Sequence, residues 1–330
     1  MGRPVRPEGR GRLPRLECGR LRPRSRACRR WRLVRAVKVK KKATRHRLAV
    51  ALVALALLVH GWGCAHLRNA ATGSLIEDVA TATSRHDDVA LVSQAIPTYL
   101  LLLEGLVEGS PDDLNLRLAA AQMYVGYATL VEADDPERAS RLYGRAKRHG
   151  LRALATKRKV APLLAAPFEE FSHIAEELDS GDLELVFWVA SSWGAWISTN
   201  LNSMAALADL PRVILLMEWI IGQDEGYQNG GPHIFLGIYH AALPPSFGGN
   251  LDKSLNHFQR ALALSEEKSL MVFVQMARFY ARRVFDRELY VSLLNRALES
   301  PVNGNPGLIL QNAVAKRMAR RLLGQVDEFF

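Results

Sequence analysis

Apolar residues recur at helical spacing through most of this chain, and this pattern constrains its fold more than any other feature. Within the segment 110–135, four such residues fall on one face of an α-helix: Leu116, Ala120, Tyr124 and Tyr127. Gly-containing turns are common, but none joins two alternating runs as a β-hairpin requires. The sequence therefore predicts an all-α fold.

Repeated helical patterns indicate how these helices are arranged. Consecutive helices of roughly 12–22 residues predict antiparallel pairs, as in an α-solenoid or a helical bundle. The segment 250–267 has a small residue, an aromatic residue and then Arg-Ala-Leu, which is typical of the second helix of a tetratricopeptide-type hairpin. Weaker copies lie at 136–151 and 290–300. Because their spacing is irregular, we expect degenerate tetratricopeptide-like hairpins.

A glycine pair shortly before Lys253 superficially suggests a loop that binds phosphate. The Walker pattern requires glycine immediately before the Lys-Ser pair, but Asp252 occupies that position and would repel a phosphate. No strand is predicted before the loop. The sequence instead predicts that Asn250 caps a helix whose inward face carries Phe258 and Leu262.

Charge is distributed very unevenly along the 330 residues, whose net charge is +11. Residues 1–48 carry 19 basic and two acidic residues, whereas the remainder carries 25 basic and 31 acidic ones, a net −6. The body therefore has no general attraction for nucleic acid. The basic segment is rich in Arg, Gly and Pro and cannot build a core. It either precedes the true translation start near Val37 or Val39, which we favour, or is a disordered nucleic-acid-binding arm.

Residues 38–64 have the three-part plan of a secretory signal peptide. A basic region ends at Arg47, and twelve uninterrupted apolar residues follow from Leu48 to Val59, fewer than the roughly 20 that a membrane span needs. Cys64 then stands where a bacterial lipoprotein is acylated. Gly61 and Trp62 depart from the usual lipobox, so a plain signal peptide with an incidental cysteine is the alternative.

These features divide the chain into four parts. We expect a basic extension with the signal n-region over 1–47, the signal h- and c-region over 48–63, a lipid anchor and tether over 64–85, and a single helical-repeat domain over 86–330. If cleavage precedes Cys64, the exported chain has no other cysteine. It then has no disulfide, no cysteine metal site and no thiol nucleophile.

An uncharged run over 185–197 is the most conspicuous candidate for a binding site. Its three tryptophans span about 140° of a helix, so no single partner covers them all. One interpretation is a central, buried helix; a second, compatible one is that the helix lines an apolar cavity or pore. The candidate lining residues are Trp188, Ser192, Trp193 and Trp196 on this helix, with Phe235 and Tyr239 on the helix predicted over 231–244.

The sequence shows no convincing catalytic or metal-binding constellation. His233 and His240 share a helical face and His257 lies on the next helix, but no His-Glu-x-x-His motif occurs. Packing or capping roles are therefore expected for these histidines. The acidic pairs fall at predicted helix ends, as caps do, and no Ser-His-Asp order with a nucleophile elbow is present. We expect no catalytic residue, no metal and no cofactor, and we predict that the protein is not an enzyme.

Five segments, in order along the chain, resemble the T component (TatT) of tripartite ATP-independent periplasmic (TRAP) transporters. They lie within Asp87–Phe330: AQMYVGYATLVEADDPERASRLYGRAKRHGLRAL, FWVASSWGAWIS, GGPHIFLGIYHAALPPSFGGNLDKSLNHFQRALAL, ARFYARRVFDRELYVSLLNRAL and LILQNAVAKRMARRLL. No single segment is specific, but the ordered set is. The lipoprotein-like start is consistent with the family, whereas the basic head is a departure from it.

This resemblance implies a periplasmic lipoprotein of tetratricopeptide-like hairpins that forms a ring-like trimer and binds the solute-binding P component. It also implies an apolar channel or cleft for a hydrophobic organic acid. We therefore expect an adaptor on the periplasmic side of the bacterial envelope, held to the membrane by its lipid anchor alone and without a nucleic-acid partner. The alternative is a general tetratricopeptide-type scaffold in the envelope with no small ligand.

Overall fold

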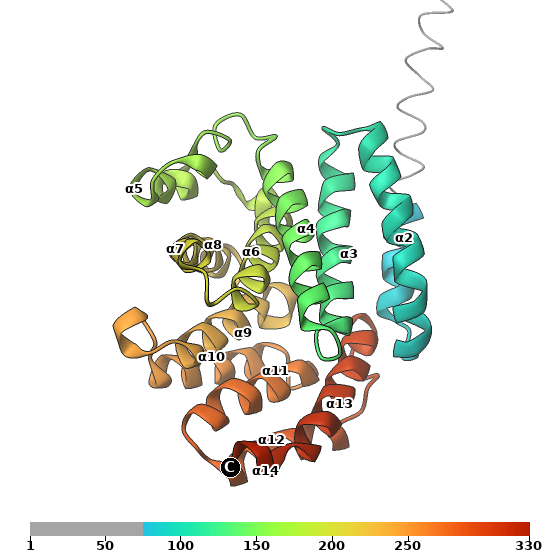
Figure 1. Ribbon diagram of the computed structural model, residues 1–330, viewed down its shortest axis with the longest axis vertical. Coiled ribbons are helices and arrows are strands. Elements are labelled where there is room, and N and C mark those ends of the chain that lie inside the picture. The colour runs from blue at the N-terminus through green and yellow to red at the C-terminus, as the bar shows by residue number, and fades with distance from the viewer. Residues whose placement is uncertain (1–74) are drawn as a thin grey trace, which may run out of the picture. The chain divides into compact units, whose positions relative to one another are not determined.

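The computed structural model describes residues 75–330, and every regular element in this part of the chain is helical (Figure 1). The predicted signal peptide and Cys64 lie outside the described residues. The α-helices are α2 (Val89–Gly109), α3 (Leu114–Val131), α4 (Pro136–Leu154), α5 (Phe168–Phe171), α6 (Leu183–Ser198), α7 (Met204–Ala208), α8 (Leu210–Gln223), α9 (Tyr227–Ala242), α10 (Leu251–Leu264), α11 (Leu270–Gln275), α12 (Arg287–Glu299), α13 (Ile309–Gly324) and α14 (Val326–Phe329). The short 3₁₀ turns are η2 (Leu163–Ala165), η3 (Ser172–Glu176), η4 (Ser180–Asp182), η5 (Pro245–Phe247) and η7 (Pro306–Leu308), and η6 (Met276–Ala281) is a π-helical turn.

The predicted all-α fold of helical hairpins is confirmed. Helices α2, α3 and α4 stand side by side, while α9, α10 and α11 lie lower, below α6 and α8 (Figure 1). Helix pairs adjacent in the chain, such as α3 with α4 and α9 with α10, form the most extensive contacts. Stacked helix pairs are the expected arrangement of degenerate repeats.

Helix starts follow the capping signals in the sequence. The side chains of Asp113, Asp135 and Asn250 each accept a hydrogen bond from a backbone N–H in the first turn of α3, α4 and α10. The Asn250 cap, at 2.9 Å from the Lys253 nitrogen, confirms the predicted helix start and leaves no phosphate-binding loop there.

Helix α9 begins less regularly than its neighbours. Gln228, Asn229 and Gly230 all have left-handed backbone angles, so regular helical geometry starts only at Gly231. That is the start predicted from the sequence. The added Cβ of any other residue at Gly230 would lie 3.1 Å from the Ala261 backbone, so this position also needs glycine for the close approach of α10.

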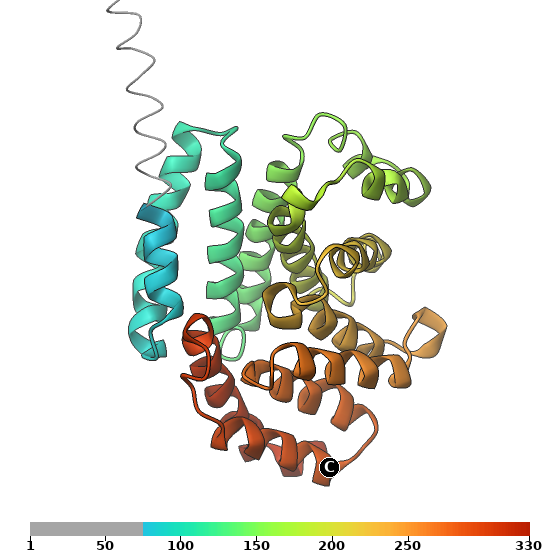
Figure 2. The same ribbon diagram turned by 180° about the vertical axis from the view of Figure 1, so that it is seen from behind.

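The last long helix closes the fold by returning to the first hairpin (Figure 2). On α13, Arg317 donates to the Leu130 carbonyl at 3.0 Å, and Arg321 pairs with Asp134 at 2.9 Å in the α3–α4 turn. In each contact the two residues are 187 positions apart in the sequence. The helices therefore form one interlocked unit over the described residues.

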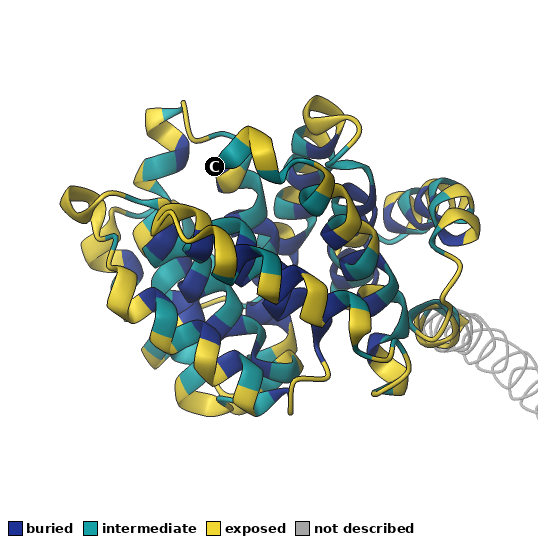
Figure 3. Ribbon diagram, turned by 90° about the horizontal axis from the view of Figure 1, so that it is seen from below, coloured by how far each residue is buried: buried dark blue, intermediate teal, exposed yellow. Residues whose placement is uncertain are grey.

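Buried residues line the inward faces of the helices, and the exposed ones face outward (Figure 3). One apolar cluster is built mainly from α10 to α13 around Phe258, Phe273 and Tyr290. A second surrounds α6 and α8, with Trp193 and Leu216 near its centre. Each fully buried large side chain contributes about 1.5–3 kcal/mol relative to exposure. The four-residue stripe predicted on α3 is buried throughout.

Residues 75–84 form a helix within the stretch that the sequence places in the tether. Ile76 of this helix packs on an apolar surface that includes Leu103 and Val107 of α2. The tether's composition is polar, and one isoleucine at a favourable position gave too weak a signal to predict the contact.

Candidate functional site

Helix α6, which carries the tryptophans, packs between α4 and α8. It begins directly after a capping box at η4. There the Asp182 carboxylate accepts a hydrogen bond from the Asp179 backbone N–H, and the Asp179 carboxylate accepts one from the backbone of η4. On the α4 side Gly150 allows close packing, since an added Cβ there would lie 3.2 Å from the Ser192 hydroxyl. The helix is thus fixed at its start and along its α4 face.

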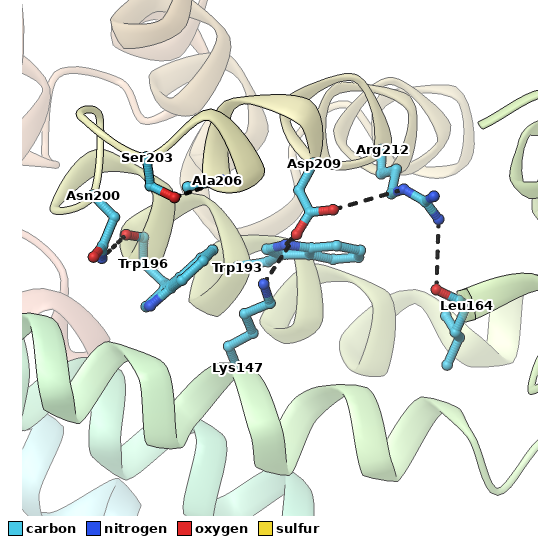
Figure 4. A network of polar contacts seen from close by, with 9 residues as sticks. All are labelled: Lys147, Leu164, Trp193, Trp196, Asn200, Ser203, Ala206, Asp209 and Arg212. Atoms are coloured by element: carbon cyan, nitrogen blue, oxygen red, sulfur yellow. Dashed lines mark hydrogen bonds and ion pairs between the residues drawn. The ribbon is translucent and has the colours of Figure 1, made fainter. Parts of the chain in front are cut away.

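Trp193 is a core residue with a paired N–H group. Its side chain is 3% exposed and meets the Phe171 ring edge to face, at 6.3 Å between centroids. The indole Nε1–H donates to Asp209 Oδ2 at 2.9 Å (Figure 4). Buried indoles usually find such a partner.

Lys147 of α4 lies between two of the predicted tryptophans (Figure 4). Its Nζ is 3.7 Å from the Trp196 ring centroid and 5.0 Å from that of Trp193, both within cation–π range. The same nitrogen donates to Asp209 at 3.0 Å. Burial lowers the pKa of Lys147, although the hydrogen bond and charge of Asp209 oppose this shift.

Arg212 completes the network around Asp209. Its Nε lies 3.8 Å from Asp209 Oδ1, and its guanidinium donates to the Ala166 carbonyl at 2.6 Å and lies over the Phe171 ring. One carboxylate therefore faces an ammonium, a guanidinium and an indole N–H, which come from α4, α6 and the start of α8. The arrangement ties three helices together and leaves one positive charge in excess.

The other predicted lining residues lie in different surroundings. Ser192 is fully buried, and its hydroxyl donates to the Val189 carbonyl of its own helix at 2.9 Å. Trp188 packs edge to face on Phe187, which in turn contacts Tyr227. That contact lies apart from the Lys147 network.

The two predicted α9 residues also separate. Phe235 packs against Gly194 of α6, so it lies beside the tryptophan helix. Tyr239 instead contacts His240 and donates to the Phe247 carbonyl at 3.4 Å in the loop before α10. The structure thus brings Trp193 and Trp196 of α6 together around Lys147, and Phe235 of α9 packs against α6 at Gly194. That these residues line a pore stays a prediction.

Sequence reasoning missed Lys147, Asp209 and Arg212. Lys147 lies in a helix that is basic along most of its length, so nothing marked it as the cation that would be buried. Asp209 directly precedes Leu-Pro at a helix start, but an aspartate in that position indicates a helix cap rather than a buried ion pair. Only the packing of α4, α6 and α8 places these three charges together.

The three histidines form a second cluster, where α9 meets α10. His233 and His257 share a hydrogen bond between their Nδ1 atoms at 2.8 Å, and the rings of His240 and His257 stack with 5.7 Å between centroids. Glu225 lies 3.2 Å from His233 Nε2, out of line for a hydrogen bond, so this contact is electrostatic. Arg260 holds Glu225 in turn, at 2.7 Å, and lowers the pKa of that carboxyl to about 2.

Acidification is expected to destabilise this α9–α10 contact. Burial, together with the charges of the neighbouring histidines and Lys253, lowers the pKa of His257 to about 4, and burial also lowers those of His233 and His240. The unfolded chain therefore takes up protons on these histidines more readily than the folded chain does. Their contribution to the free energy of unfolding is complete above about pH 6.5 and is lost as the pH falls through about 4.

Urea unfolding between pH 7 and pH 4 measures this effect. His257→Asn, which keeps a donor near the Nδ1 position but cannot be charged, should flatten the fall in unfolding free energy over that range. His173→Asn, at an exposed histidine outside the cluster, is the matched control and should leave the slope as in the wild type. An unchanged slope for His257→Asn would show that the cluster does not govern the acid response.

Among residues 75–330, no group of three His, Cys, Asp or Glu side chains is arranged to hold a metal ion. In the same part of the chain, α2 is long and apolar enough to cross a membrane by length and composition alone. Core helices of globular proteins pass this test too, and five α2 residues are buried in the fold: Val92, Ile96, Leu100, Leu103 and Val107.

Fold and network together define a helical-hairpin protein whose central helix is tied to its neighbours by aromatic and charged contacts. The family model of the TRAP transporter T-component matches residues 85–330, and the chain belongs to this family. The match starts close to the predicted beginning of the helical domain at residue 86. The family is an accessory component of transporters rather than a family of enzymes, and this associates the chain with the cell envelope.

A similar protein is found in Treponema pallidum (strain Nichols), where it is described as an uncharacterized protein. It is 25% identical over 272 residues, which cover 77% of this chain and 84% of the relative. The similarity therefore extends across most of both chains.

Proposed function

We propose that this chain is an envelope-anchored, periplasmic adaptor of a TRAP-type solute uptake system and binds its solute-binding P component. Membership of the T-component family over residues 85–330 is the observation that carries the proposal. Stacked helical hairpins support it, because such folds commonly present extended surfaces to protein partners.

The anchor and the assembly are parts of the same proposal. Cys64 is acylated after signal cleavage and holds the protein to the membrane, and the protein forms a trimer. Twelve apolar residues followed by a cysteine support the first statement. Mass spectrometry of the N-terminal peptide tests it, and sedimentation of the purified protein tests the trimer.

A pull-down with the P component is the direct test of the function. The tagged protein, purified in detergent, should retain the solute-binding protein encoded beside it, and an unrelated periplasmic binding protein serves as the control. We expect saturable retention of the neighbouring protein alone. Failure to retain it, or the absence of adjacent genes for a solute-binding protein and a permease, would contradict the adaptor role.

The bound solute in this proposal is an apolar organic acid held near the tryptophan helix. One observation favours the alternative, a scaffold without a small ligand: Trp193 is almost fully buried and its N–H is already paired with Asp209. Extraction and mass spectrometry of the purified protein separate the two. A stoichiometric organic acid supports the ligand-binding adaptor, and its repeated absence supports the scaffold.

A further inference from the structure

Helix α4 carries a row of arginines along its outward face. This row, the arginine stripe, consists of Arg138, Arg141, Arg145, Arg148 and Arg152. Because their spacing alternates between three and four residues, they lie on one side of the helix. All of them are exposed, whereas the opposite side of α4 is buried against the fold. The stripe is roughly 21 Å long, since an α-helix rises about 1.5 Å per residue.

The charge of this region is opposite to that of the rest of the described chain. The segment 138–159 has nine basic residues and no acidic one. The other described residues, 75–137 and 160–330, have 15 basic and 31 acidic residues. An acidic partner is therefore attracted to this face and repelled by the remainder of the protein.

Carboxylates of the protein neutralise the stripe only in part. Among residues 75–330, Glu137 lies 3.9 Å from Arg141 and Glu104 lies 3.7 Å from Arg145, and no other carboxylate comes within 4 Å of the stripe. Three of its positive charges are therefore in excess. By contrast, Lys159, just beyond the end of α4, pairs with Glu177 at 2.7 Å.

The stripe is unfavourable for the helix itself. Like charges three or four residues apart repel one another on a helix surface, and here such pairs follow in succession. Arg138 also lies in the first turn of α4, where the helix dipole disfavours a positive charge. Carboxylates supplied by a partner would relieve this repulsion.

Tyrosines of α3 hold two of the stripe arginines in place. Arg138 donates to the Tyr127 hydroxyl at 2.9 Å, and Arg145 donates to the Tyr124 hydroxyl at 3.1 Å. Each guanidinium also lies within cation–π range of the same tyrosine, at 5.2 and 5.9 Å from the ring centroid. Both tyrosines are buried. Because these long side chains are already held, less conformational entropy is lost when a partner binds.

We propose that the arginine stripe of α4 is the surface on which a carboxylate-rich face of the P component docks. The inference rests on the proposed adaptor function and adds the docking surface to it. Guanidinium groups form paired, charge-assisted hydrogen bonds with carboxylates, so a row of arginines matches a row of Asp or Glu side chains. Along Pro136–Leu154 no large apolar side chain is exposed. A helix that lies on a membrane carries such side chains beside its basic residues, so a protein surface is favoured over anionic lipid.

Charge reversal at two stripe positions, Arg141→Glu with Arg148→Glu, tests the proposal. The full chain, purified in detergent, is passed over immobilised P component, the solute-binding protein encoded beside it. Association should be slower than in the wild type by on the order of tenfold or more at about 50 mM salt, and the difference should shrink at about 500 mM salt because exposed charges are screened. Each new glutamate lies three or four residues from the arginines that are left, so the unfolding midpoint should not fall.

Arg283→Glu with Arg320→Glu is the matched control. Both arginines are exposed and lie outside α4, and the pair changes the net charge by the same amount. It should associate within about threefold of the wild type. An equal loss in the two double variants would show an effect of net charge alone and would overturn the proposal.

Failure of the docking surface can be told apart from failure of the adaptor role. If the wild type binds the P component and the α4 variant binds it equally fast, the docking surface is wrong and the adaptor role stands. If the wild type does not bind it, both are wrong. Stripe-dependent flotation with phosphatidylglycerol vesicles, or stripe-dependent self-association in sedimentation, without stripe-dependent P-component binding, would assign the surface to lipid or to a second copy and overturn the proposal.

Discussion

Replacing Asp209 by alanine is expected to lower the free energy of unfolding by about 2–4 kcal/mol. The change removes the carboxylate that, among residues 75–330, faces Lys147, Arg212 and the Trp193 indole N–H. Two cations and an indole donor then stay close together with no acceptor among them. Urea unfolding followed by tryptophan fluorescence measures the loss, and the fluorescence also reports on Trp193 itself.

Asp209→Asn is the matched variant, because it keeps the size and one acceptor oxygen. We expect it to cost less, about 1–2 kcal/mol, since the Trp193 hydrogen bond can survive while the charge is lost. In Asp209→Ala the pKa of Lys147 in the folded protein should fall further. Between that lowered value and the ordinary pKa of lysine, the unfolded chain then binds more protons than the folded chain. Stability should then rise with pH above neutrality. A loss below about 0.5 kcal/mol in Asp209→Ala would show that the network is worth no more than an exposed ion pair.

Replacing Gly194 by alanine is expected to destabilise the protein by about 1–3 kcal/mol, although alanine favours helices more than glycine does. An added Cβ at Gly194 would overlap the Phe235 ring, with Cζ at 3.1 Å and Cε2 closer still. Either the ring or the α6–α9 contact must shift. Thermal or urea unfolding of the variant measures the cost.

Two further variants separate this clash from a general effect of alanine. In a Phe235→Ala background the space is open, so Gly194→Ala should cost nothing, and the double-mutant cycle gives the coupling directly. Gly126→Ala is the matched control, since an added Cβ at that exposed helical position meets nothing within 4 Å. It should stabilise the protein by about 0.5–1 kcal/mol. A neutral Gly194→Ala would mean that Phe235 moves aside freely.

Local features of the sequence were sufficient to predict the helices and their N-terminal caps. Asn250 and Pro136 mark helix starts because a side chain or a proline ring acts on backbone groups within the first helical turn. Phe258 and Leu262 were predicted on the inward face because a period of 3.6 residues puts them together; Phe258 is fully buried, and Leu262 is partly buried against the same core. The helix at 75–84 was not predicted, and the contact of its Ile76 with α2 and α3 joins residues too far apart in the sequence for a local pattern to indicate.

The candidate site was predictable only in part. An uncharged run with three tryptophans indicated a central helix, and α6 is central. The same run could not show that Trp188 would face Phe187 while Trp193 and Trp196 would enclose Lys147.

The sequence by itself thus determined the all-α class, the helix boundaries at capped starts and the family. These depend on interactions between residues three or four positions apart, or on an ordered set of segments. The tertiary structure alone decided which charges are buried and with what partners. Lys147 and Asp209 are 62 residues apart, and they meet only because α4, α6 and α8 pack together. The energy of a buried charge depends on such distant neighbours, so no local pattern in the chain records it.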